Sequence, residues 1–375
     1  MKVKLGDIFE IGSGGTPSKS HPEYYGGDIP WVKTGDLKSE YLYEVEDFIT
    51  EEGLKNSSAK LYEPDTVLIA MYGATIGATS ILKMDACTNQ ACAAFKKNDK
   101  VIPEYLYYFL KSQKVKFVKD GVGGAQPNIS AGYLKKVEME LPSLDEQRAI
   151  VEVLDKTTNI MVMRNQEIAS LDNLIKARFV EMFGDCNNMI SMSELCSIIT
   201  DGTHQPPKFQ ETGIPFIFVS NLANNTVTYN AEKFISKETY NELYKRTPIE
   251  PGDLLLSTVG SYGHPAVVVE DTKFLFQRHI AYLKPKKEII NSFYLHSALL
   301  SSDCQRQIEE KVKGIAQKTL NLSEIRKIMI PVPNIEAQNL FVDFIYQVDK
   351  SKVEVQKALD ETQLLFDSLM QEYFG

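Results

Sequence analysis

The sequence predicts an α+β protein with an internal repeat, in which two mixed α/β globules are joined by two long helices that form an antiparallel coiled coil. Three observations lead to this fold class. The 375-residue chain repeats itself at an offset of about 190 residues. Each repeat opens with short apolar runs broken by Gly, Pro, Asn and Ser. Each repeat closes with a segment that contains neither Pro nor Gly. The predicted boundaries are 1–142 and 185–333 for the globules, and 143–184 and 334–375 for the helices.

The repeat is clearest at a few fixed points. Residues 29–32 (IPWV) are echoed by 214–217 (IPFI), and 68–77 (LIAMYGATIG) by 255–263 (LLSTVGSYG), with one residue deleted. Residues 141–147 (LPSLDEQ) are echoed by 332–338 (VPNIEAQ), and both halves end in Phe-Gly. A match at these points, with loose similarity between them, predicts two copies of one fold that carry different surfaces. A solenoid would have a far shorter period.

Each globule is expected to mix strands and helices. Thr66–Met71 and Leu254–Thr258 have the apolar character of strands, while Pro103–Lys119 and Asn291–Lys313 are helical runs. Asp65 and Asp253 each follow a proline at matching places in the repeat. A role in a turn explains both aspartates without acid–base chemistry.

The two long helices are predicted from their starts and from a heptad pattern. Ser143 and Asn334 are cap-like residues after a proline, with Glu146 or Ala337 three residues later. Forty residues make a helix of about 60 Å, whose thin apolar stripe needs a partner. The repeat itself is the expected partner, in an antiparallel pair that relates the globules by a pseudo-twofold; the alternative is that each helix packs on its own globule. The predicted seam consists of Ile150, Leu154, Met161, Ile168, Leu171 and Ile175, and of Phe341, Ile345, Val348, Leu359, Phe366 and Leu369.

Composition limits the function classes. The net charge is −9, but the helical segments hold most of the excess, with five basic against seven acidic residues in 143–184 and three against eight in 334–375. The globules are therefore close to neutral, and the overall acidity does not exclude nucleic acid as a partner. No apolar run approaches the roughly 18 residues of a membrane span, so we expect a cytoplasmic protein with no membrane partner. The five cysteines are odd in number and form no CxxC pair, which argues against disulfides and zinc.

The doubled arrangement carries a resemblance to a known family. A Gly-x-x-Gln-x-x-(Ile/Leu)-(Ser/Asn) stretch stands at residues 123–130 and again at 314–321, followed each time by the motif that starts a long helix. With the opening at residues 4–8 (KLGDI), the chain resembles, over essentially its whole length, the specificity subunits of Type I restriction–modification systems. It departs from the pattern at Ala337, where an acid is usual, and in lacking the paired glycines 123–124 in its second copy. These departures put the local loop conformation in question, but not the family.

The resemblance implies a role in DNA recognition. Each globule would be a target recognition domain for one half of a bipartite site in double-stranded DNA, and the helices would be conserved spacers that fix the gap. The helices would also dock two methyltransferase (modification) subunits, and restriction/translocase subunits would complete the complex. S-adenosylmethionine, ATP and Mg are expected in those partner subunits, and none of them in this chain.

The residues agree with a non-catalytic role. The chain lacks an Asn/Asp-Pro-Pro-aromatic tetrad, since Pro206-Pro207 follows a glutamine, and it lacks a P-loop. Gly12–Gly15 is a glycine cluster better explained as a tight loop than as a phosphate site. The five histidines have no helical metal-site spacing. We therefore expect no catalytic residue and no metal ligand.

Candidate DNA contacts lie in loops at matching positions of the two globules, because functional residues concentrate on loops held by a scaffold. Their polar side chains suit phosphate and base contacts, although turn chemistry alone could explain any one of them. In the first globule they are Ser13, Thr16, Lys19, Tyr72, Thr75, Gln126 and Asn128. In the second they are Thr203, His204, Lys208, Ser261, Tyr262, Gln317 and Lys318.

Two basic stretches are weaker candidates. Residues 96–119 hold seven lysines against two acids, and 273–327 hold eleven basic against five acidic residues. A solvated helix face explains such runs as well as DNA binding does. The aromatic residues between the lysines of 96–119 fit a core better than base stacking.

Other functions remain open from the sequence. The chain could serve a methylation-only or Type II-like system, or it could be a two-globule scaffold that binds proteins. Salt-dependent, sequence-selective DNA binding would distinguish recognition from a protein scaffold. Turnover by the pure chain would revive a third possibility, a stand-alone DNA enzyme.

Overall fold

The computed structural model describes residues 1–122, 128–314 and 318–375. It divides into two compact units, and each unit combines one globule with parts of both long helices. Unit 1 consists of Met1–Asn165 and Lys357–Gly375, and unit 2 consists of Gln166–Gln356. The predicted fold class, mixed globules with an antiparallel helix pair, is confirmed.

The globule of unit 1 contains two sheets and a terminal strand pair. The larger sheet has the order β2-β10-β7-β8-β4 and the smaller one β5-β3-β9-β6, while β1 pairs with β11. The strands are β1 (Lys2–Lys4), β2 (Ile11–Ser13), β3 (Tyr25–Val32), β4 (Tyr41–Leu42), β5 (Phe48–Ile49), β6 (Leu61–Tyr62), β7 (Val67–Ala70), β8 (Thr79–Leu82), β9 (Ala86–Thr88), β10 (Cys92–Phe95) and β11 (Glu138–Glu140). The helices are α1 (Leu5–Ile8), α2 (Glu51–Lys55), α3 (Pro103–Ser112), α4 (Lys114–Asp120) and α5 (Ala131–Leu134).

The globule of unit 2 repeats this plan. Its larger sheet has the order β13-β19-β16-β17, its smaller sheet β15-β14-β18, and β12 pairs with β20. The strands are β12 (Met189–Ser191), β13 (Cys196–Asp201), β14 (Ile214–Ile217), β15 (Lys233–Ile235), β16 (Leu254–Ser257), β17 (Pro265–Val267), β18 (Leu275–Phe276), β19 (Ile280–Pro285) and β20 (Met329–Pro331). The helices are α7 (Met192–Leu195), α8 (Lys237–Leu243), α9 (Ser292–Leu300), α10 (Ser302–Lys311) and α11 (Leu322–Ile325).

The central strands match pair by pair between the two globules. In each, the second strand of the larger sheet (β10 or β19) pairs antiparallel with two neighbours. In each, the smaller sheet contains one parallel pair, β3 with β9 or β14 with β18. The predicted strand runs at 66–71 and 254–258 form the fully buried β7 and β16. Unit 1 differs by adding β4 at one edge of its larger sheet and β6 to its smaller sheet.

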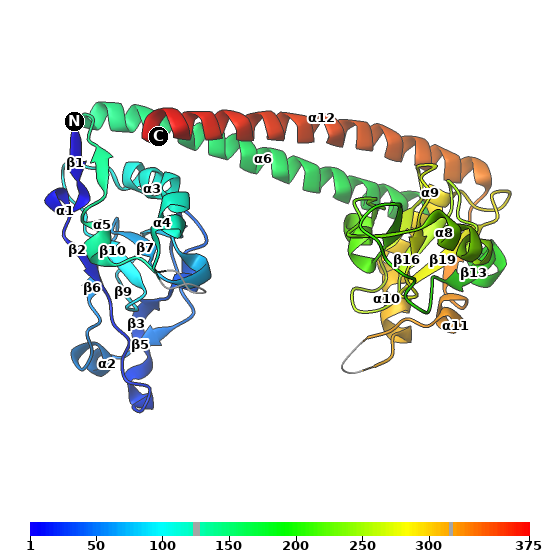
Figure 1. The fold of residues 1–375 in the computed structure, drawn as a ribbon, viewed down its shortest axis with the longest axis horizontal. Coiled ribbons are helices and arrows are strands. Elements are labelled where there is room, and N and C mark those ends of the chain that lie inside the picture. The colour runs from blue at the N-terminus through cyan, green and yellow to red at the C-terminus, as the bar shows by residue number, and fades with distance from the viewer. Residues whose placement is uncertain (123–127, 315–317) are drawn as a thin grey trace. The chain divides into compact units, whose positions relative to one another are not determined.

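Both runs predicted as single helices are in fact two helices. The run 103–119 is divided between α3 and α4 at Gln113, and the run 291–313 between α9 and α10 at Ser301. Ser301 has an extended backbone and its side chain accepts from the backbone N–H of Cys304, so it ends one helix and caps the next. In unit 1, α3 lies against the long helices (Figure 1), where the Tyr108 hydroxyl donates to Asp155 at 2.7 Å.

The long helices are α6 (Leu144–Phe183) and α12 (Ile335–Phe374). Ser143 and Glu146 form the capping box of α6, with Ser143 N donating to Glu146 Oε2 at 2.8 Å and Glu146 N donating to Ser143 Oγ at 3.3 Å. At α12 the box is incomplete. Asn334 Oδ1 accepts from Ala337 N at 2.9 Å, and Ala337 has no side chain that could reach back.

A buried glutamine attaches each long helix to its globule. Gln147 Oε1 accepts from Ile102 N at 2.9 Å, and Gln147 Nε2 donates to the carbonyl oxygens of Lys100 and Pro142 at 2.9 and 3.0 Å. Gln338 does the same in unit 2, where its three bonds join Asn291 N, Ile289 O and Pro333 O at 2.9, 3.1 and 2.9 Å. Both side chains are fully buried. The repeated Pro-x-x-x-x-Gln motif is therefore explained by a backbone clamp.

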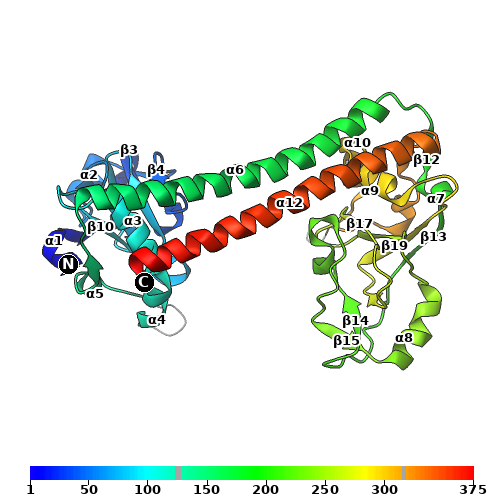
Figure 2. The ribbon, with the colours of Figure 1, turned by 90° about the horizontal axis from the view of Figure 1, so that it is seen from above.

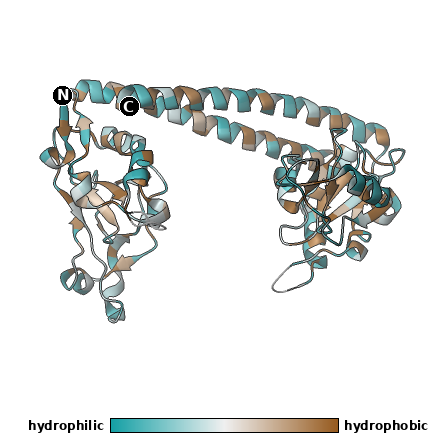
Figure 3. Ribbon diagram, in the orientation of Figure 1, coloured by the Kyte–Doolittle hydropathy of each residue, from teal (hydrophilic) through white to brown (hydrophobic). Residues whose placement is uncertain are grey.

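Within each unit the two helices run side by side and antiparallel, as Figure 2 shows. Leu154 of α6 and Phe366 of α12 belong to the core of unit 1, and Phe179 and Phe341 belong to that of unit 2, with ring centroids 5.5 Å apart. Figure 3 shows hydrophilic and hydrophobic residues alternating along both helices. Every residue of the predicted seam is buried or half-buried: Ile150, Leu154, Met161, Ile168, Leu171, Ile175, Phe341, Ile345, Val348, Leu359, Phe366 and Leu369.

Candidate nucleic-acid interface

Backbone hydrogen bonds hold the predicted loops of the first globule side by side. Three bonds join them, donor first: Gly15 N to Thr88 O at 2.9 Å, Met71 N to Ala91 O at 2.8 Å, and Ile129 N to Met71 O at 3.0 Å. Tyr72 and Asn128 also pair as an isolated antiparallel bridge. The loop after β2, the loop after β7 and the segment that begins at Asn128 therefore form one surface.

The second globule brings its loops together through the same bonds. The matching bonds are Thr203 N to Phe276 O at 2.8 Å, Thr258 N to His279 O at 2.9 Å, and Leu320 N to Thr258 O at 2.8 Å. A bridge between Val259 and Thr319 replaces the one between Tyr72 and Asn128. A small hollow of about 260 Å³ opens between these loops, and its walls include Thr258, Arg278, His279, Thr319 and Asn321.

At the centre of each surface lies a turn that the sequence analysis missed. Residues 89–91 connect β9 to β10, and residues 277–279 connect β18 to β19. The loop after β2 or β13 passes so close to this turn that only glycine fits. A Cβ on Gly14 would lie 1.8 Å from the carbonyl oxygen of Thr88, and one on Gly202 would lie 2.3 Å from that of Phe276. Gly14 and Gly15 thus lie in a tight loop, the interpretation favoured from the sequence, while Gly12 and Ser13 belong to β2.

The predicted contact residues of the first globule differ in exposure. Tyr72 is 44 % exposed, Asn128 and Lys19 are exposed, and Ser13, Thr16 and Thr75 are half-buried. Ser13 pairs with Ala93 at the end of β2, and the Thr75 hydroxyl donates to Tyr72 O at 3.1 Å. The Thr16 hydroxyl donates to Gln90 Oε1 in the central turn. Gln126 lies outside the described residues.

In the second globule, His204, Lys208, Ser261 and Lys318 are exposed, and Thr203 and Tyr262 are half-buried. His204 Nε2 lies 2.8 Å from Asp201 Oδ2, and Lys318 Nζ lies 5.9 Å from the centre of the Tyr262 ring. Gln317 lies outside the described residues. Within the described ranges, the exposed side chains of Lys19 and Lys208 form no hydrogen bond or ion pair with the other loops.

The basic stretch 96–119 divides into two kinds of lysine. Lys96 pairs with Glu10 at 2.8 Å and Lys97 with Asp65 at 3.0 Å. Lysines 114, 116 and 119 are exposed on α4. The five aromatic residues between the lysines are at most 7 % exposed and form core: Tyr105, Tyr107, Tyr108, Phe109 and Phe117. They offer no surface for base stacking.

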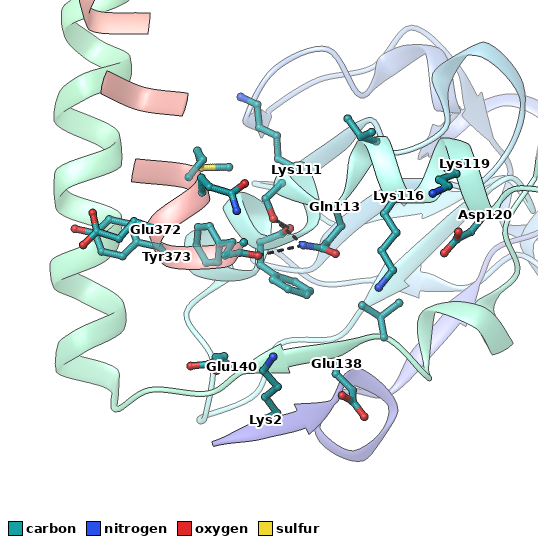
Figure 4. A pocket seen from close by; sticks show the side chains of 18 of the residues that line it. Lys2, Lys111, Gln113, Lys116, Lys119, Asp120, Glu138, Glu140, Glu372 and Tyr373 are labelled. Atoms are coloured by element: carbon teal, nitrogen blue, oxygen red, sulfur yellow. Dashed lines mark hydrogen bonds between the residues drawn. The ribbon is translucent and has the colours of Figure 1, made fainter. Parts of the chain in front are cut away.

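A larger groove of about 1400 Å³ lies elsewhere in unit 1, beside α4, β1, β11 and the end of α12. Figure 4 shows Gln113 at its centre, where Nε2 donates to the carbonyl oxygen of Phe374 at 3.4 Å. The charges that line the groove are mixed, comprising Lys2, Lys111, Lys116, Lys119, Lys136, Asp120, Glu138, Glu140, Asp367 and Glu372. A groove without one dominant sign does not select a polyanion. Its contacts instead dock the end of α12 on the globule.

In residues 1–122, 128–314 and 318–375, no three or more His, Cys, Asp or Glu side chains gather as a metal site would require. No helix in these ranges combines the length and apolarity needed to cross a membrane.

Comparison with known proteins gives a consistent result. The family model described as the Type I restriction modification DNA specificity domain matches residues 1–173 and 187–362, one copy for each repeat. The MjaIX Type I restriction enzyme specificity subunit of Methanocaldococcus jannaschii is 26 % identical over 98 % of this chain and 90 % of its own length. The EcoBI specificity subunit of Escherichia coli is 25 % identical over 83 % of this chain and 73 % of its own length.

Solved structures share the fold. One, described as the structural basis of complex assembly and conformational transition of the type I R-M system, covers 100 % of this chain and 97 % of its own, with a TM-score of 0.66 at 17 % identity. The S subunit of a Type I restriction–modification system from M. genitalium covers 100 % and 96 %, with a TM-score of 0.52 at 16 % identity.

Proposed function

The chain belongs to the Type I restriction–modification DNA specificity family, and from this membership we propose that it recognises a bipartite DNA target and positions modification subunits on it. The observation that carries the proposal is the pair of loop surfaces. The same backbone hydrogen bonds hold the loops in both globules, yet the side chains at matching positions differ, for example Tyr72 against Val259 and Asn128 against Thr319. One frame with two sets of side chains is what two different half-sites require.

DNA binding by these surfaces would combine two kinds of contact. Exposed lysines such as Lys19, Lys208 and Lys318 would contact phosphates and set position. The polar side chains nearer the central turn would contact base edges in the major groove. Binding should therefore weaken steeply with salt, although the chain carries a net charge of −9, because the acidic excess lies in the helices.

The long helices would set the distance between the half-sites. One heptad inserted in both α6 and α12 would add about 10.5 Å. We expect this insertion to lengthen the unspecified gap by about 3 base pairs, at 3.4 Å per base pair. Loss of binding at every gap length would argue against this role of the long helices.

Two modification subunits would dock on the helices. The long helices expose apolar residues at equivalent places in the two repeats: Val162 and Val353 are 48 % and 66 % exposed, and Leu174 and Leu365 are 47 % and 54 % exposed. Each unit thus presents one valine and one leucine to solvent. Repeated exposed apolar positions suit two copies of the same partner. Restriction/translocase subunits would join through these partners.

The chain itself would perform no chemistry. Methyl transfer to adenine would take place in the modification subunits, which would bind S-adenosylmethionine, while ATP and Mg would belong to the restriction/translocase subunits. This assignment rests on family membership and on the missing catalytic motifs. A complex that modifies chromosomal DNA would work in the cytoplasm.

The test is to co-express the full chain with the modification subunits in a host without adenine methylation, and to map methylated adenines across the genome. A motif with two specified halves and a fixed gap is the expected result. A continuous motif would overturn the bipartite proposal. A stable complex that neither methylates nor binds DNA selectively would instead point to a protein-interaction scaffold. Cleavage of unmodified DNA after addition of a restriction subunit separates a restricting system from a methylation-only one.

A further inference from the structure

The central turns of the two globules are equivalent residue by residue. Asn89 N donates to Val32 O at 2.9 Å, and Gln277 N donates to Ile217 O at 3.1 Å. Inside the turns, Cys92 N donates to Asn89 O at 3.2 Å and Ile280 N to Gln277 O at 3.1 Å. With the bonds from Met71 N to Ala91 O and from Thr258 N to His279 O, these contacts fix both turns in one geometry. Gln90 and Arg278 therefore occupy the same backbone position.

Both side chains are exposed in the middle of the loop surfaces. Gln90 neighbours the loop after β2, through the hydroxyl of Thr16. Arg278 N donates to Thr203 O at 3.1 Å, and its side chain lines the hollow shared with Thr258 and Thr319. The loops at Thr16 and Met71 in unit 1, and those at Thr203, Thr258 and Thr319 in unit 2, thus lie next to this position. Its central place among them suits contact with a base pair.

Neighbouring groups orient both side chains without using up their recognition edges. Gln90 Oε1 accepts from Thr16, which leaves a second lone pair on Oε1 and both hydrogens on Nε2. Arg278 Nε donates to His279 Nε2 at 3.3 Å, which leaves both Nη groups available. Burial, with the neighbouring Arg278 cation, lowers the pKa of His279, so the ring is neutral and able to accept. Within the described residues Arg278 forms no ion pair that would hold it away from DNA.

We propose that Gln90 and Arg278 are the specificity-determining pair of this protein, with Gln90 recognising an adenine in one half-site and Arg278 a guanine in the other. A glutamine amide accepts from adenine N6 and donates to N7, and an arginine fork donates to guanine O6 and N7. The inference rests on the proposed function. It adds that one position, with a different side chain in each globule, determines one base of each half-site. The adenine recognised by Gln90 is not the methylated one, because a base that undergoes chemistry is flipped out of the stack.

The experiment uses the full chain in complex with its modification subunits, and it measures both the methylation motif and binding to duplexes that vary at single positions. Arg278→Gln should relax or replace the specificity for one guanine of one half-site. Affinity for the original site should fall by about 10- to 100-fold, and the other half-site should stay unchanged. Gln90→Leu should relax one adenine in the opposite half-site by a similar factor. Arg306→Gln is the matched control, because Arg306 pairs with Asp303 and Glu310 on α10.

The outcomes separate this inference from the proposed function. If the wild-type complex shows no bipartite motif, the proposed function fails. If the wild-type motif is bipartite but both variants keep it unchanged, only the present inference is overturned. A uniform loss over all sequences, with a salt slope smaller by about 1, would make Arg278 a phosphate contact and would also overturn it. If Arg278→Gln does not assemble, Arg278→Lys, which keeps the charge and loses the fork, should weaken discrimination at one guanine; unchanged discrimination would overturn the inference.

Discussion

The turn that precedes the buried strand β7 or β16 contains a residue with a positive φ in both units, but the residue type differs. In unit 1 it reads Glu63-Pro64-Asp65, and in unit 2 Glu250-Pro251-Gly252. Asp65 and Gly252 both adopt a positive φ, 69° and 95°, and their N–H groups donate to matching carbonyls, Leu82 O and Val268 O, both at 2.8 Å. Unit 1 places an aspartate in this strained conformation and ties it to Lys83 and Lys97 at 2.8 and 3.0 Å. Unit 2 uses glycine.

The aspartate of unit 2 stands one place later in the turn. Asp253 is fully buried, and its Oδ2 accepts from the Tyr282 hydroxyl at 2.8 Å and from Glu250 N at 2.9 Å. Its counterpart in unit 1 is Thr66. Pairing Asp65 with Asp253, as the sequence suggested, is therefore wrong. The repeat has kept backbone hydrogen bonds and the sign of φ, while the chemistry of the side chains has changed.

Substitution of the two buried glutamines, Gln147 and Gln338, tests whether the units are also equivalent where the long helices attach. It has the largest expected effect on stability. Gln147→Leu or Gln338→Leu would leave one backbone N–H and two carbonyl groups buried without partners. We expect each change to lower the free energy of unfolding of its unit by about 3 kcal/mol. Urea unfolding, with hydrogen exchange to locate the unit, measures the loss. Gln347→Leu, on an exposed face of α12, should change it by less than about 0.5 kcal/mol. Unequal losses in the two units would mean that the clamps are not equivalent.

The two aspartates should give the units opposite responses to pH. The bonds from Lys83 and Lys97 lower the pKa of Asp65, so its contribution to unit 1 is present above the unfolded pKa near 3.8 and is lost as pH falls below it. Burial raises the pKa of Asp253, so unit 2 loses stability as pH rises from 3.8 through the folded pKa. Unfolding measured from pH 3 to 8 tests both assignments. Asp65→Asn should reduce the pH dependence of the stability of unit 1, and Asp253→Asn should reduce that of unit 2. Asp253→Ala should also cost about 2 kcal/mol at neutral pH, because Glu250 N would lose its acceptor and the Tyr282 hydroxyl would keep only Pro248 O. Responses of the same sign in both units would contradict this assignment.

Exchanging the turn residues should show a smaller, asymmetric effect. Gly252→Ala places a residue with a Cβ at a positive φ. It should lower the free energy of unfolding of unit 2 by about 1 to 2 kcal/mol, measured by thermal unfolding. Asp65→Gly relieves the same conformation but loses the contacts with Lys83 and Lys97. We expect it to change the free energy of unfolding of unit 1 by less than about 1 kcal/mol, because ion pairs at the protein surface contribute little. If Gly252→Ala had no cost, the positive φ would not be what the turn conserves.

The smallest expected effect is at the helix starts. Ala337→Glu would complete at α12 the capping box that Ser143 and Glu146 form at α6, and should stabilise unit 2 by about 0.5 kcal/mol. Ser143→Ala removes the cap of α6 and should cost unit 1 about 1 kcal/mol. Thermal unfolding of the two variants beside the parent measures both. If Ala337→Glu lowered the stability, a group near residue 337 would disfavour a glutamate there.

The sequence predicted the long helices almost to the residue, because a proline, a cap and a terminal Phe-Gly are local signals. It predicted the loop surfaces in outline, because loops at matching positions of a repeat share a scaffold. It could not predict the central turn at Gln90 and Arg278. These side chains share no chemistry, and only bonds from distant strands reveal their equivalence. The breaks at Gln113 and Ser301 were missed because neither a proline nor a glycine marks them in the sequence.

Unit 1 is built from two separate segments of the chain, and this affects how the protein folds during synthesis. Unit 2 is one continuous segment, 166–356, whereas unit 1 needs residues 357–375 to cover its core, where Phe366 and Met370 pack with Tyr108 and Leu154. During synthesis the chain emerges from its N-terminus. The globule that leaves the ribosome first is therefore the last to be completed. Until α12 has emerged in full, the apolar face around Tyr108 stays open, and nascent chains at that stage are the ones most exposed to aggregation.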